Sequence, residues 1–166
     1  MIFADLPVGS SIFLDANTFI YHFTAHSVFG PPCAQLLQGI RQYQFAGFTS
    51  THVLSEVAHR LMTTEASARY NWPFAGIVYR LKQNPLEVQK LTVFRQAIDE
   101  IPRFGLQILS IPPALIAVAA ALSQQTGLLS NDALIVAIMQ ANGLMNLASE
   151  DSDFDRVPGI ARYAPA

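Results

Sequence analysis

The sequence predicts an α/β fold with three layers, a mostly parallel central sheet and helices on both faces. Short apolar runs alternate with segments of helical periodicity, and that order is typical of a parallel sheet covered on both sides. The composition is 51% hydrophobic and only 13% charged, which excludes a disordered chain and is enough to fill a core. At a length of 166 residues we expect a single domain over residues 1–166.

The first half of the chain contains two apolar runs, each followed by helical segments. Residues 11–14 lead directly into Asp15, which is typical of a buried parallel strand. Ser50 or Thr51 can cap the helix after the second run, because a hydroxyl oxygen accepts a free amide at a helix start. The expected elements are a strand at 11–14, helices at 17–23 and 31–43, a strand at 44–49 and a helix that ends near 62.

The second half adds a helical insert and then three more strands. Asn84-Pro85 splits the insert, since proline cannot continue a helix. The expected elements are helices at 71–83 and 86–100, a strand at 104–109, helices at 112–125 and 133–140, a strand at 144–148, a loop at 149–156 and a strand at 160–163. Four aromatic residues are expected to form a hydrophobic face of the insert: Trp72, Phe74, Tyr79 and Phe94.

The charge balance and the cysteine content restrict the partners and the compartment. Ten Lys and Arg against twelve Asp and Glu give a net charge of −2, so a polyanion would need a local patch or a bound cation. Four arginines can touch a phosphate backbone or form a solvated or partner-binding face: Arg60, Arg69, Arg80 and Arg95. One cysteine, Cys33, favours a reducing compartment. The chain start lacks a basic segment and the apolar runs are too short to cross a bilayer, so we expect a cytoplasmic protein without membrane contact.

Acidic residues follow the predicted strands. Asp15 ends the first strand, Asp151 follows the strand at 144–148, and Asp132 lies in the first turn of the most apolar helix. Parallel sheets bind ligands at the carboxyl ends of their strands, and Glu56, on the helix after the second strand, can lean over that edge. Each acid also has an ordinary interpretation. Asp15 or Asp132 can stabilise a helix start, while Glu56 can be a solvated helix residue and Asp151 part of a polar turn.

Four short segments together resemble the PIN domain family. They are Phe13-Leu14-Asp15-Ala16-Asn17-Thr18-Phe19, Ser55-Glu56, the segment 128–137 (LLSNDALIVA) and the segment 148–154 (ASEDSDF). They occur in family order and at fitting intervals over nearly the whole chain, and stand-alone chains of this size look like the VapC-type toxin ribonucleases. The resemblance implies a PIN-like three-layer α/β/α domain with a helical insert.

The resemblance also implies the site residues. The acidic quartet of the family corresponds to Asp15, Glu56, Asp132 and Asp151, the expected catalytic residues. The expected supporting residues are Asn17, Thr18, Ser149 and Asp153. In the last loop, four acids compete for one role: Glu150, Asp151, Asp153 and Asp155. Asp151 is preferred because it matches the Asp of the family's Thr-x-Asp-x-x-Phe pattern, in which Ser149 replaces the threonine and Phe154 is the aromatic residue.

Converging carboxylates require a counter-charge. Two of them ~4 Å apart repel by roughly 4 kcal/mol at an effective dielectric constant of 20, so either their pKa values rise or a divalent cation binds between them. Oxygen ligands favour Mg²⁺ or Mn²⁺ over Zn²⁺, and the chain has no HExxH or CxxC motif. We expect Asp15, Asp132 and Asp151 to be metal ligands, and Glu56 to orient or activate the attacking water.

The expected function is a metal-dependent endoribonuclease, and the resemblance implies the toxin of a type II toxin–antitoxin system. It also implies a homodimer and an antitoxin whose tail enters the acidic site, often through an arginine. Two alternatives within the fold are a non-catalytic RNA-binding or protein-interaction module and an RNA-processing nuclease outside toxin–antitoxin systems. A phosphatase with Asp15 as nucleophile is disfavoured, because that chemistry needs an acid two positions later and Asn17 stands there.

Overall fold

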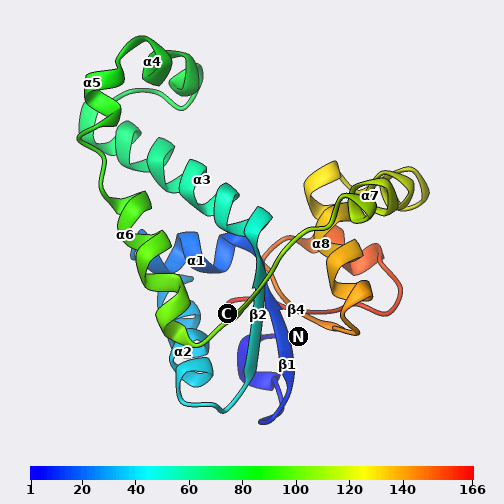
Figure 1. Cartoon of the computed structure of the whole chain (residues 1–166). Helices are drawn as coiled ribbons and strands as arrows, with labels where there is room; N and C mark the ends of the chain where they lie inside the picture. The colour runs from blue at the N-terminus through cyan, green and yellow to red at the C-terminus, as the bar shows by residue number, and fades with distance from the viewer.

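The computed structural model describes all 166 residues, and five parallel strands organise them (Figure 1). The strands are β1 Ser11–Leu14, β2 Ala46–Ser50, β3 Gln107–Leu109, β4 Asn146–Ala148 and β5 Ala161–Tyr163, in the spatial order β3-β2-β1-β4-β5. Every neighbouring pair is parallel, so the sheet is entirely parallel. In the central strand, Phe13 is in register with Phe48 of β2 and Leu147 of β4. The predicted α/β fold class is confirmed.

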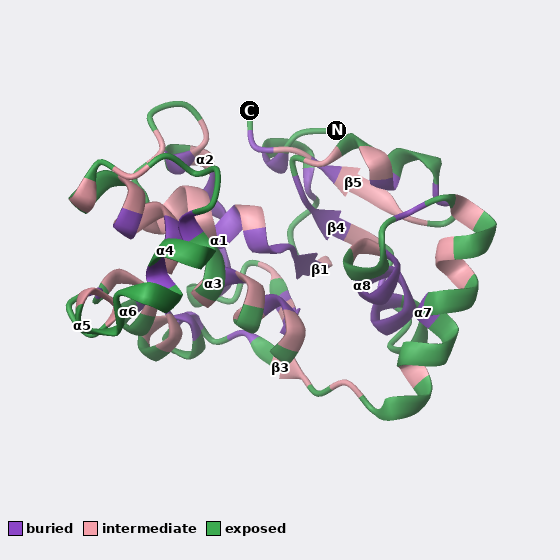
Figure 2. Ribbon diagram, turned by 90° about the horizontal axis from the view of Figure 1, so that it is seen from above, coloured by how far each residue is buried: buried purple, intermediate pink, exposed green.

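Helices cover both faces of the sheet. The helices are α1 Ala16–Phe23, α2 Gly30–Arg41, α3 Thr51–Tyr70, α4 Ile77–Gln83, α5 Pro85–Val88, α6 Val93–Glu100, α7 Pro113–Thr126 and α8 Ser130–Ala141. The chain also contains three short 3-10 helices: η1 Phe3–Asp5, η2 Ile101–Phe104 and η3 Ser152–Arg156. The α1, α2, α3 and α6 helices lie on one side of the sheet, and α7 and α8 lie on the other (Figure 2).

The core lies along β1 and α8. Ile12, Phe13 and Leu14 are fully buried, because β1 is the central strand and is covered on both faces. In α8, all residues from Ala133 to Met139 are buried, since α7 packs over the side of α8 that the sheet leaves uncovered. No single helix is long and apolar enough to cross a membrane; α7 and α8 reach that length and composition only as a pair, with a 114° bend between them.

The helical insert differs from the prediction in its boundaries. The α3 helix continues to Tyr70 instead of ending near Met62 and stops only where Asn71 adopts a left-handed conformation. It continues because residues 63–69 contain neither glycine nor proline and bury Ala66 in a small cluster with Ile77, Leu81 and Leu91. The predicted helix at 71–83 is therefore reduced to α4.

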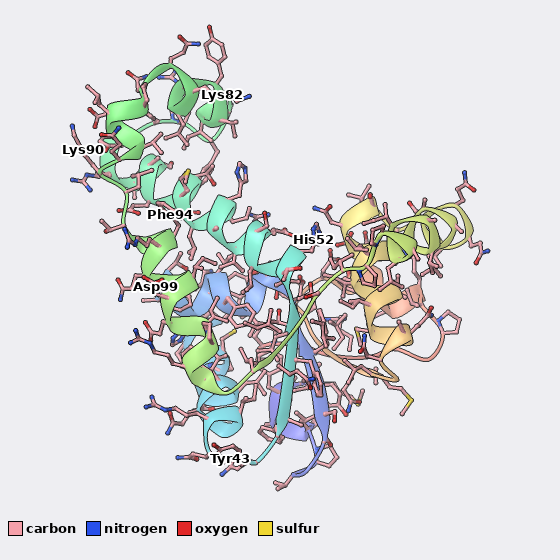
Figure 3. All side chains as sticks on the ribbon, in the orientation of Figure 1. Tyr43, His52, Lys82, Lys90, Phe94 and Asp99 are labelled. Carbon is pink, nitrogen blue, oxygen red and sulfur yellow. The ribbon has the colours of Figure 1, made fainter.

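The predicted helix at 86–100 is divided into α5 and α6. The Glu65 carboxylate on α3 accepts the backbone N–H groups of Thr92 and Val93, at 2.9–3.1 Å, and so satisfies the free amides at the start of α6. The short α4 and α5 helices form a head at the far end of α3, where Lys82 and Lys90 lie (Figure 3).

The prediction that four aromatic residues form a hydrophobic face of the insert is wrong for two of them. Trp72 and Phe94 pack against the small cluster of the head. Phe74 and Tyr79 are instead 62% and 67% exposed. The reason is the shortened α4, whose apolar residues Ile77 and Leu81 point inward and leave Tyr79 on the outer side.

Candidate active site

The ends of β1 and β4 bring two acidic segments together. These strands are neighbours, and the backbone N–H of Asp15 donates to the carbonyl of Ala148 at 3.1 Å. The chain after β1 therefore lies beside the segment Ser149–Asp151. Glu56 comes from the second turn of α3, and Asp132 from the first turn of α8. Four segments far apart in the sequence thus meet at the carboxyl edge of the sheet.

These acids surround one cavity of about 380 Å³. Its lining residues are Asp15, Ala16, Asn17, Ile20, Tyr21, Glu56, Arg60, Asp132, Glu150 and Asp151. The four acids predicted as catalytic all line this cavity, together with Asn17. The other supporting residues predicted from the sequence, Thr18, Ser149 and Asp153, do not line it.

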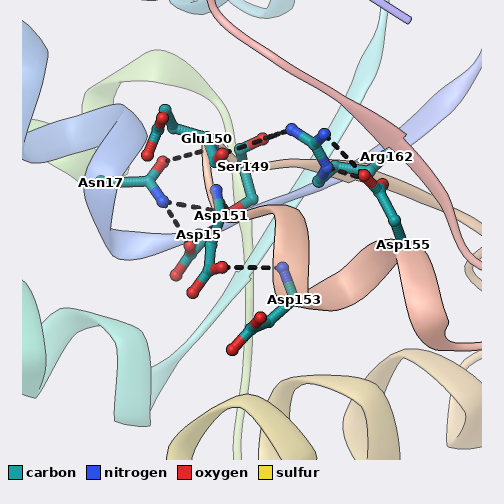
Figure 4. Close-up of polar contacts among 8 residues, drawn as sticks. All are labelled: Asp15, Asn17, Ser149, Glu150, Asp151, Asp153, Asp155 and Arg162. Atoms are coloured by element: carbon teal, nitrogen blue, oxygen red, sulfur yellow. Dashed lines mark hydrogen bonds and ion pairs between the residues drawn. The ribbon is translucent and has the colours of Figure 1, made fainter. Parts of the chain in front are cut away.

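Asp15 is held by three donors. The backbone N–H of Ala16 donates to Oδ1 at 2.6 Å, while the Asn17 amide and the Ser149 hydroxyl donate to Oδ2 at 2.6 Å and 2.7 Å (Figure 4). The side chain is only 8% exposed. Asp15 is also the N-cap residue of α1. It therefore both stabilises the start of a helix and lines the cavity.

Asn17, Thr18 and Ser149 join the loops after β1 and β4. The Asn17 amide donates to Ser149 Oγ at 3.0 Å, and its carbonyl oxygen accepts the backbone N–H of Glu150 at 3.3 Å. The Thr18 hydroxyl donates to the carbonyl of Ala148 at 3.2 Å. Ser149 Oγ also accepts the backbone N–H of Asp151 at 3.1 Å. These contacts fix the position of Asp15 relative to Asp151.

The four acids of the last loop have different surroundings. Glu150 and Asp151 line the cavity, whereas Asp153 pairs with Arg156. Asp155 pairs with Arg162 of β5 through two contacts of 2.7 Å and 2.8 Å. Asp151 also accepts the backbone N–H of Asp153 at 2.8 Å and so caps η3. Asp153 and Asp155 therefore each pair with an arginine, whereas Glu150 and Asp151 form no ion pair and line the cavity.

Burial and crowding raise the pKa values of two of the acids. The pKa of Asp15 is raised from 3.8 to about 7, chiefly by burial and further by Glu56 and Asp132, although the hydrogen bonds from Ser149 and Ala16 act in the opposite direction. The pKa of Asp132 is raised to about 6 by burial, then by Asp151, Glu56 and Asp153. The cavity therefore takes up protons near neutral pH unless another positive charge enters it.

The donor set fits a hydrated hard cation. All the acids that line the cavity offer carboxylate oxygens, the ligands that Mg²⁺ and Mn²⁺ prefer. No three His, Cys, Asp or Glu side chains lie close enough together to hold one metal ion directly. Mg²⁺ commonly keeps several waters and binds through one or two carboxylates, so Asp15 and Asp132, the two acids with raised pKa values, suit such an ion.

Two further residues at or beside the cavity, Tyr21 and Arg162, were not predicted from the sequence. Tyr21 lines the cavity from α1, and its spacing of four residues from Asn17 would have placed it on the same helix face. Arg162 donates to the backbone carbonyls of Ser149 and Glu150 at 3.2 Å and 3.3 Å. Its position in the last strand, next to β4, becomes informative only once the strand order is known.

Comparisons with known proteins assign the chain to a family. The PIN domain matches residues 12–160. VapBC2 from Rickettsia felis, bound to a DNA fragment from their promoter, is similar with a TM-score of 0.58 and 17% identity, over 93% of this chain and 98% of that chain. VapC20 from Mycobacterium tuberculosis, a toxin that cleaves the sarcin–ricin loop, has a TM-score of 0.59 and 16% identity, over 87% and 92% of the two chains.

A toxin–antitoxin complex from Klebsiella pneumoniae has a TM-score of 0.54 and 19% identity, over 90% of this chain and 95% of that chain. At these identities the three likenesses concern the fold. No curated protein matches the sequence. The family match spans most of the chain and includes all four acids that line the cavity. This chain belongs to the PIN domain family.

Proposed function

We propose that this chain is a metal-dependent endoribonuclease and the toxin component of a type II toxin–antitoxin system. The observation that carries the proposal is the convergence of Asp15, Glu56, Asp132 and Asp151 on one cavity. PIN domains are typically nucleases, and three solved structures with a similar fold are toxins or toxin–antitoxin complexes. The whole chain, residues 1–166, would act as one domain.

In this proposal Asp15, Asp132 and Asp151 would hold Mg²⁺ or Mn²⁺ partly through water molecules, because no three of the acidic side chains lie close enough together to bind one ion directly. A bound divalent cation neutralises phosphate charge and lowers the pKa of a water molecule. Ser149 and Asn17 hold Asp15 in place, since both donate to its Oδ2, and the Ser149 bond lowers the pKa of Asp15 against the effect of burial. Without these two donors the buried carboxylate would retain its proton to a higher pH, because hydrogen bonds to the charged form favour that form.

Glu56 is the acid that we assign to the attacking water. It lines the cavity, and its side chain forms no hydrogen bond or ion pair in the structure. Its oxygens are therefore free to accept a proton from water as the water attacks the phosphorus atom, while the P–O bond to the leaving ribose oxygen breaks and that oxygen gains a proton from solvent. Thr18 would act indirectly, through its hydrogen bond to the carbonyl of Ala148 at the end of β4.

The proposed antitoxin partner follows from the same site. An acidic cavity suits an arginine of a cognate antitoxin, because a guanidinium can replace the charge of the cation and bind carboxylates through two parallel hydrogen bonds. We also propose that the chain forms a homodimer and acts in the cytoplasm, where its one buried cysteine, Cys33, stays reduced.

Cleavage of total bacterial RNA in Mn²⁺ tests the proposal. The wild-type protein should cut RNA, and Asp15→Asn and Asp132→Asn should each lower the rate by about 100-fold or more, since both remove charge from the same site. Asp99→Asn is the matched control, because Asp99 lies on the exposed side of α6 (Figure 3). Mn²⁺-dependent cleavage that survives both cavity substitutions would refute the assignment of the site. RNA binding without cleavage would favour the non-catalytic module.

A further inference from the structure

The cavity has many hydrogen-bond acceptors and few free donors. Five carboxyl groups line it, from Asp15, Glu56, Asp132, Glu150 and Asp151, and ionised carboxylates only accept. The Asn17 amide already donates to Asp15 and Ser149. The side-chain donors that remain are the guanidinium of Arg60 and the hydroxyl of Tyr21. The non-bridging oxygens of a phosphodiester are acceptors. When the carboxyl groups are ionised, these two residues are therefore the only lining side chains with uncommitted donors for them.

Arg60 is available for such a contact. It is exposed, lies one helical turn after Glu56 on α3 and is the only basic residue of the lining. Its guanidinium makes no hydrogen bond or ion pair, although five carboxyl groups surround the same cavity. By contrast, Arg69 and Arg95 on the insert pair with Glu65 and Asp99.

Tyr21 faces the same cavity from α1, which packs against α3. The ring packs against His26 and Phe29, whose ring centroids lie 4.9 Å and 5.1 Å from its own. Its hydroxyl makes no hydrogen bond in the structure. A packed aromatic ring loses little conformational freedom when its hydroxyl binds a ligand, so the donor is already in position.

We infer that Arg60 and Tyr21 form a phosphate-binding pair for single-stranded RNA at the cavity of this protein. The inference rests on the proposed ribonuclease function and adds the residues that bind the substrate. Arg60 supplies a charge-assisted, two-pronged contact to the non-bridging oxygens of one phosphate. Tyr21 donates its hydroxyl to the same backbone from the facing helix. The pair offsets the repulsion between the RNA and the carboxylates next to the metal ligands.

A different role for Arg60 is to compensate Glu56, since the two residues are four apart on α3 and Glu before Arg is the favourable order. The two roles have different consequences for salt dependence. A residue that neutralises an RNA phosphate contributes about 0.7 to the slope of log Kd against log salt for single strands. An arginine that acts only on Glu56 contributes nothing to that slope.

The test measures binding of a short, fluorescein-labelled single-stranded RNA of random sequence, with Ca²⁺ in place of Mn²⁺ and over a series of KCl concentrations. Arg60→Ala should weaken binding about 10- to 100-fold and reduce the salt slope by about 0.7. Arg60→Lys should restore the slope and part of the affinity. Tyr21→Phe, which removes one oxygen, should weaken binding about 3- to 10-fold and leave the slope unchanged.

Arg41→Ala is the matched control. Arg41 is also exposed and unpaired, but it ends α2 at the opposite edge of the sheet, beside the turn that contains Tyr43 (Figure 3). Its removal should change neither affinity nor slope.

The outcomes separate the inference from the proposed function. If the wild-type protein binds and cleaves RNA but Arg60→Ala, still folded by circular dichroism, keeps the wild-type affinity and slope, the inference is wrong and the proposed function stands. If the wild-type protein neither binds nor cleaves RNA, both are wrong. If Arg60→Ala does not fold, the RNA affinities of Arg60→Lys and Tyr21→Phe test the inference instead. A wild-type affinity for both of these variants would overturn the pair.

Discussion

Ser149 Oγ donates a hydrogen bond of 2.7 Å to Oδ2 of Asp15 (Figure 4). The two residues are 134 positions apart in the chain, and each directly follows one of two neighbouring parallel strands. The bond connects Asp15, which lines the cavity, to the loop that carries Asp151. It also lowers the pKa of Asp15 against the effect of burial, so Ser149 controls how much of Asp15 is ionised near neutral pH.

We predict that Ser149→Ala shifts the acidic limb of the pH–activity profile upward by about one pH unit. A hydrogen bond to a charged group contributes about 1.5–3 kcal/mol, and one pKa unit corresponds to about 1.4 kcal/mol. Without the hydroxyl, Asp15 keeps its proton to a higher pH, so activity that needs the ionised form of Asp15 begins only at a higher pH. Ser149→Thr, which retains the hydroxyl, should keep the wild-type profile. An unshifted profile for Ser149→Ala would show that this bond does not control the ionisation of Asp15.

The metal-free protein should lose stability as the pH rises from about 5 to about 7. Asp15 has a pKa of about 7 in the folded chain and 3.8 as its ordinary value, so in this range the folded state binds more protons than the unfolded state. Stability then falls with pH, at a slope of up to about 1.4 kcal/mol per pH unit for one proton. Asp132, with its pKa raised to about 6, acts in the same direction.

Urea denaturation in EDTA at several pH values measures this effect, and Asp15→Asn should flatten the pH dependence. Asp99→Asn should leave it unchanged, because Asp99 is exposed. If the free energy of unfolding of the wild-type protein rises over the same range, or if Asp15→Asn follows the wild-type curve, burial of Asp15 does not have the expected effect.

Binding of Mn²⁺ should release protons at pH 6 and almost none at pH 8.5. A carboxylate must be ionised to bind a cation, and Asp15 is mostly protonated at pH 6 because its pKa is about 7. Asp132, with a pKa of about 6, is about half protonated at the same pH. Calorimetric titrations in buffers with different ionisation enthalpies count the protons, and we expect between about one and two at the lower pH. Equal proton release at both pH values would place the ion away from Asp15.

Substitutions in the last loop should separate its acids. Asp151→Asn should lower RNA cleavage by about 100-fold or more, because Asp151 lines the cavity. Asp155→Asn should leave cleavage near the wild-type rate and cost less than about 1 kcal/mol of stability, because the Asp155 side chain is 55% exposed and pairs with Arg162. Single-turnover cleavage and urea denaturation of both variants measure this difference, and a larger loss of activity in Asp155→Asn would reverse the assignment.

Several features of the fold can be predicted from local sequence patterns. The strand at 11–14 was predicted with its observed bounds, because a short apolar run that ends in an acid is a strong local signal. The helix predicted at 112–125 is α7, which ends where Gly127 adopts a left-handed conformation. The predicted position of Asp132 in the first turn of the most buried helix also agrees with the structure. These features depend on contacts within a few residues, which a sequence displays directly.

The features that the sequence could not supply depend on tertiary contacts. The extension of α3 to Tyr70 depends on the burial of Ala66 against the insert. The break before α6 depends on Glu65, whose carboxylate caps α6 from 27 and 28 residues away. Among the last four acids, the neutralisation of Asp155 depends on Arg162, which reaches it from β5. Tyr21 carries no motif of its own. Its spacing from Asn17 places the two residues on one face of α1, but only the position of α1 beside α3 shows that this face borders the cavity.

The affinity for Mn²⁺ tests most directly whether these distant acids act on one ion. We predict that the wild-type protein binds Mn²⁺ at pH 8, and that Asp15→Asn and Asp132→Asn each weaken binding by about tenfold or more. The double substitution should have less than the combined effect of the two single ones, because both residues would bind the same ion. Unchanged Mn²⁺ affinity in both single variants, measured by electron paramagnetic resonance of the free ion, would contradict a shared metal site.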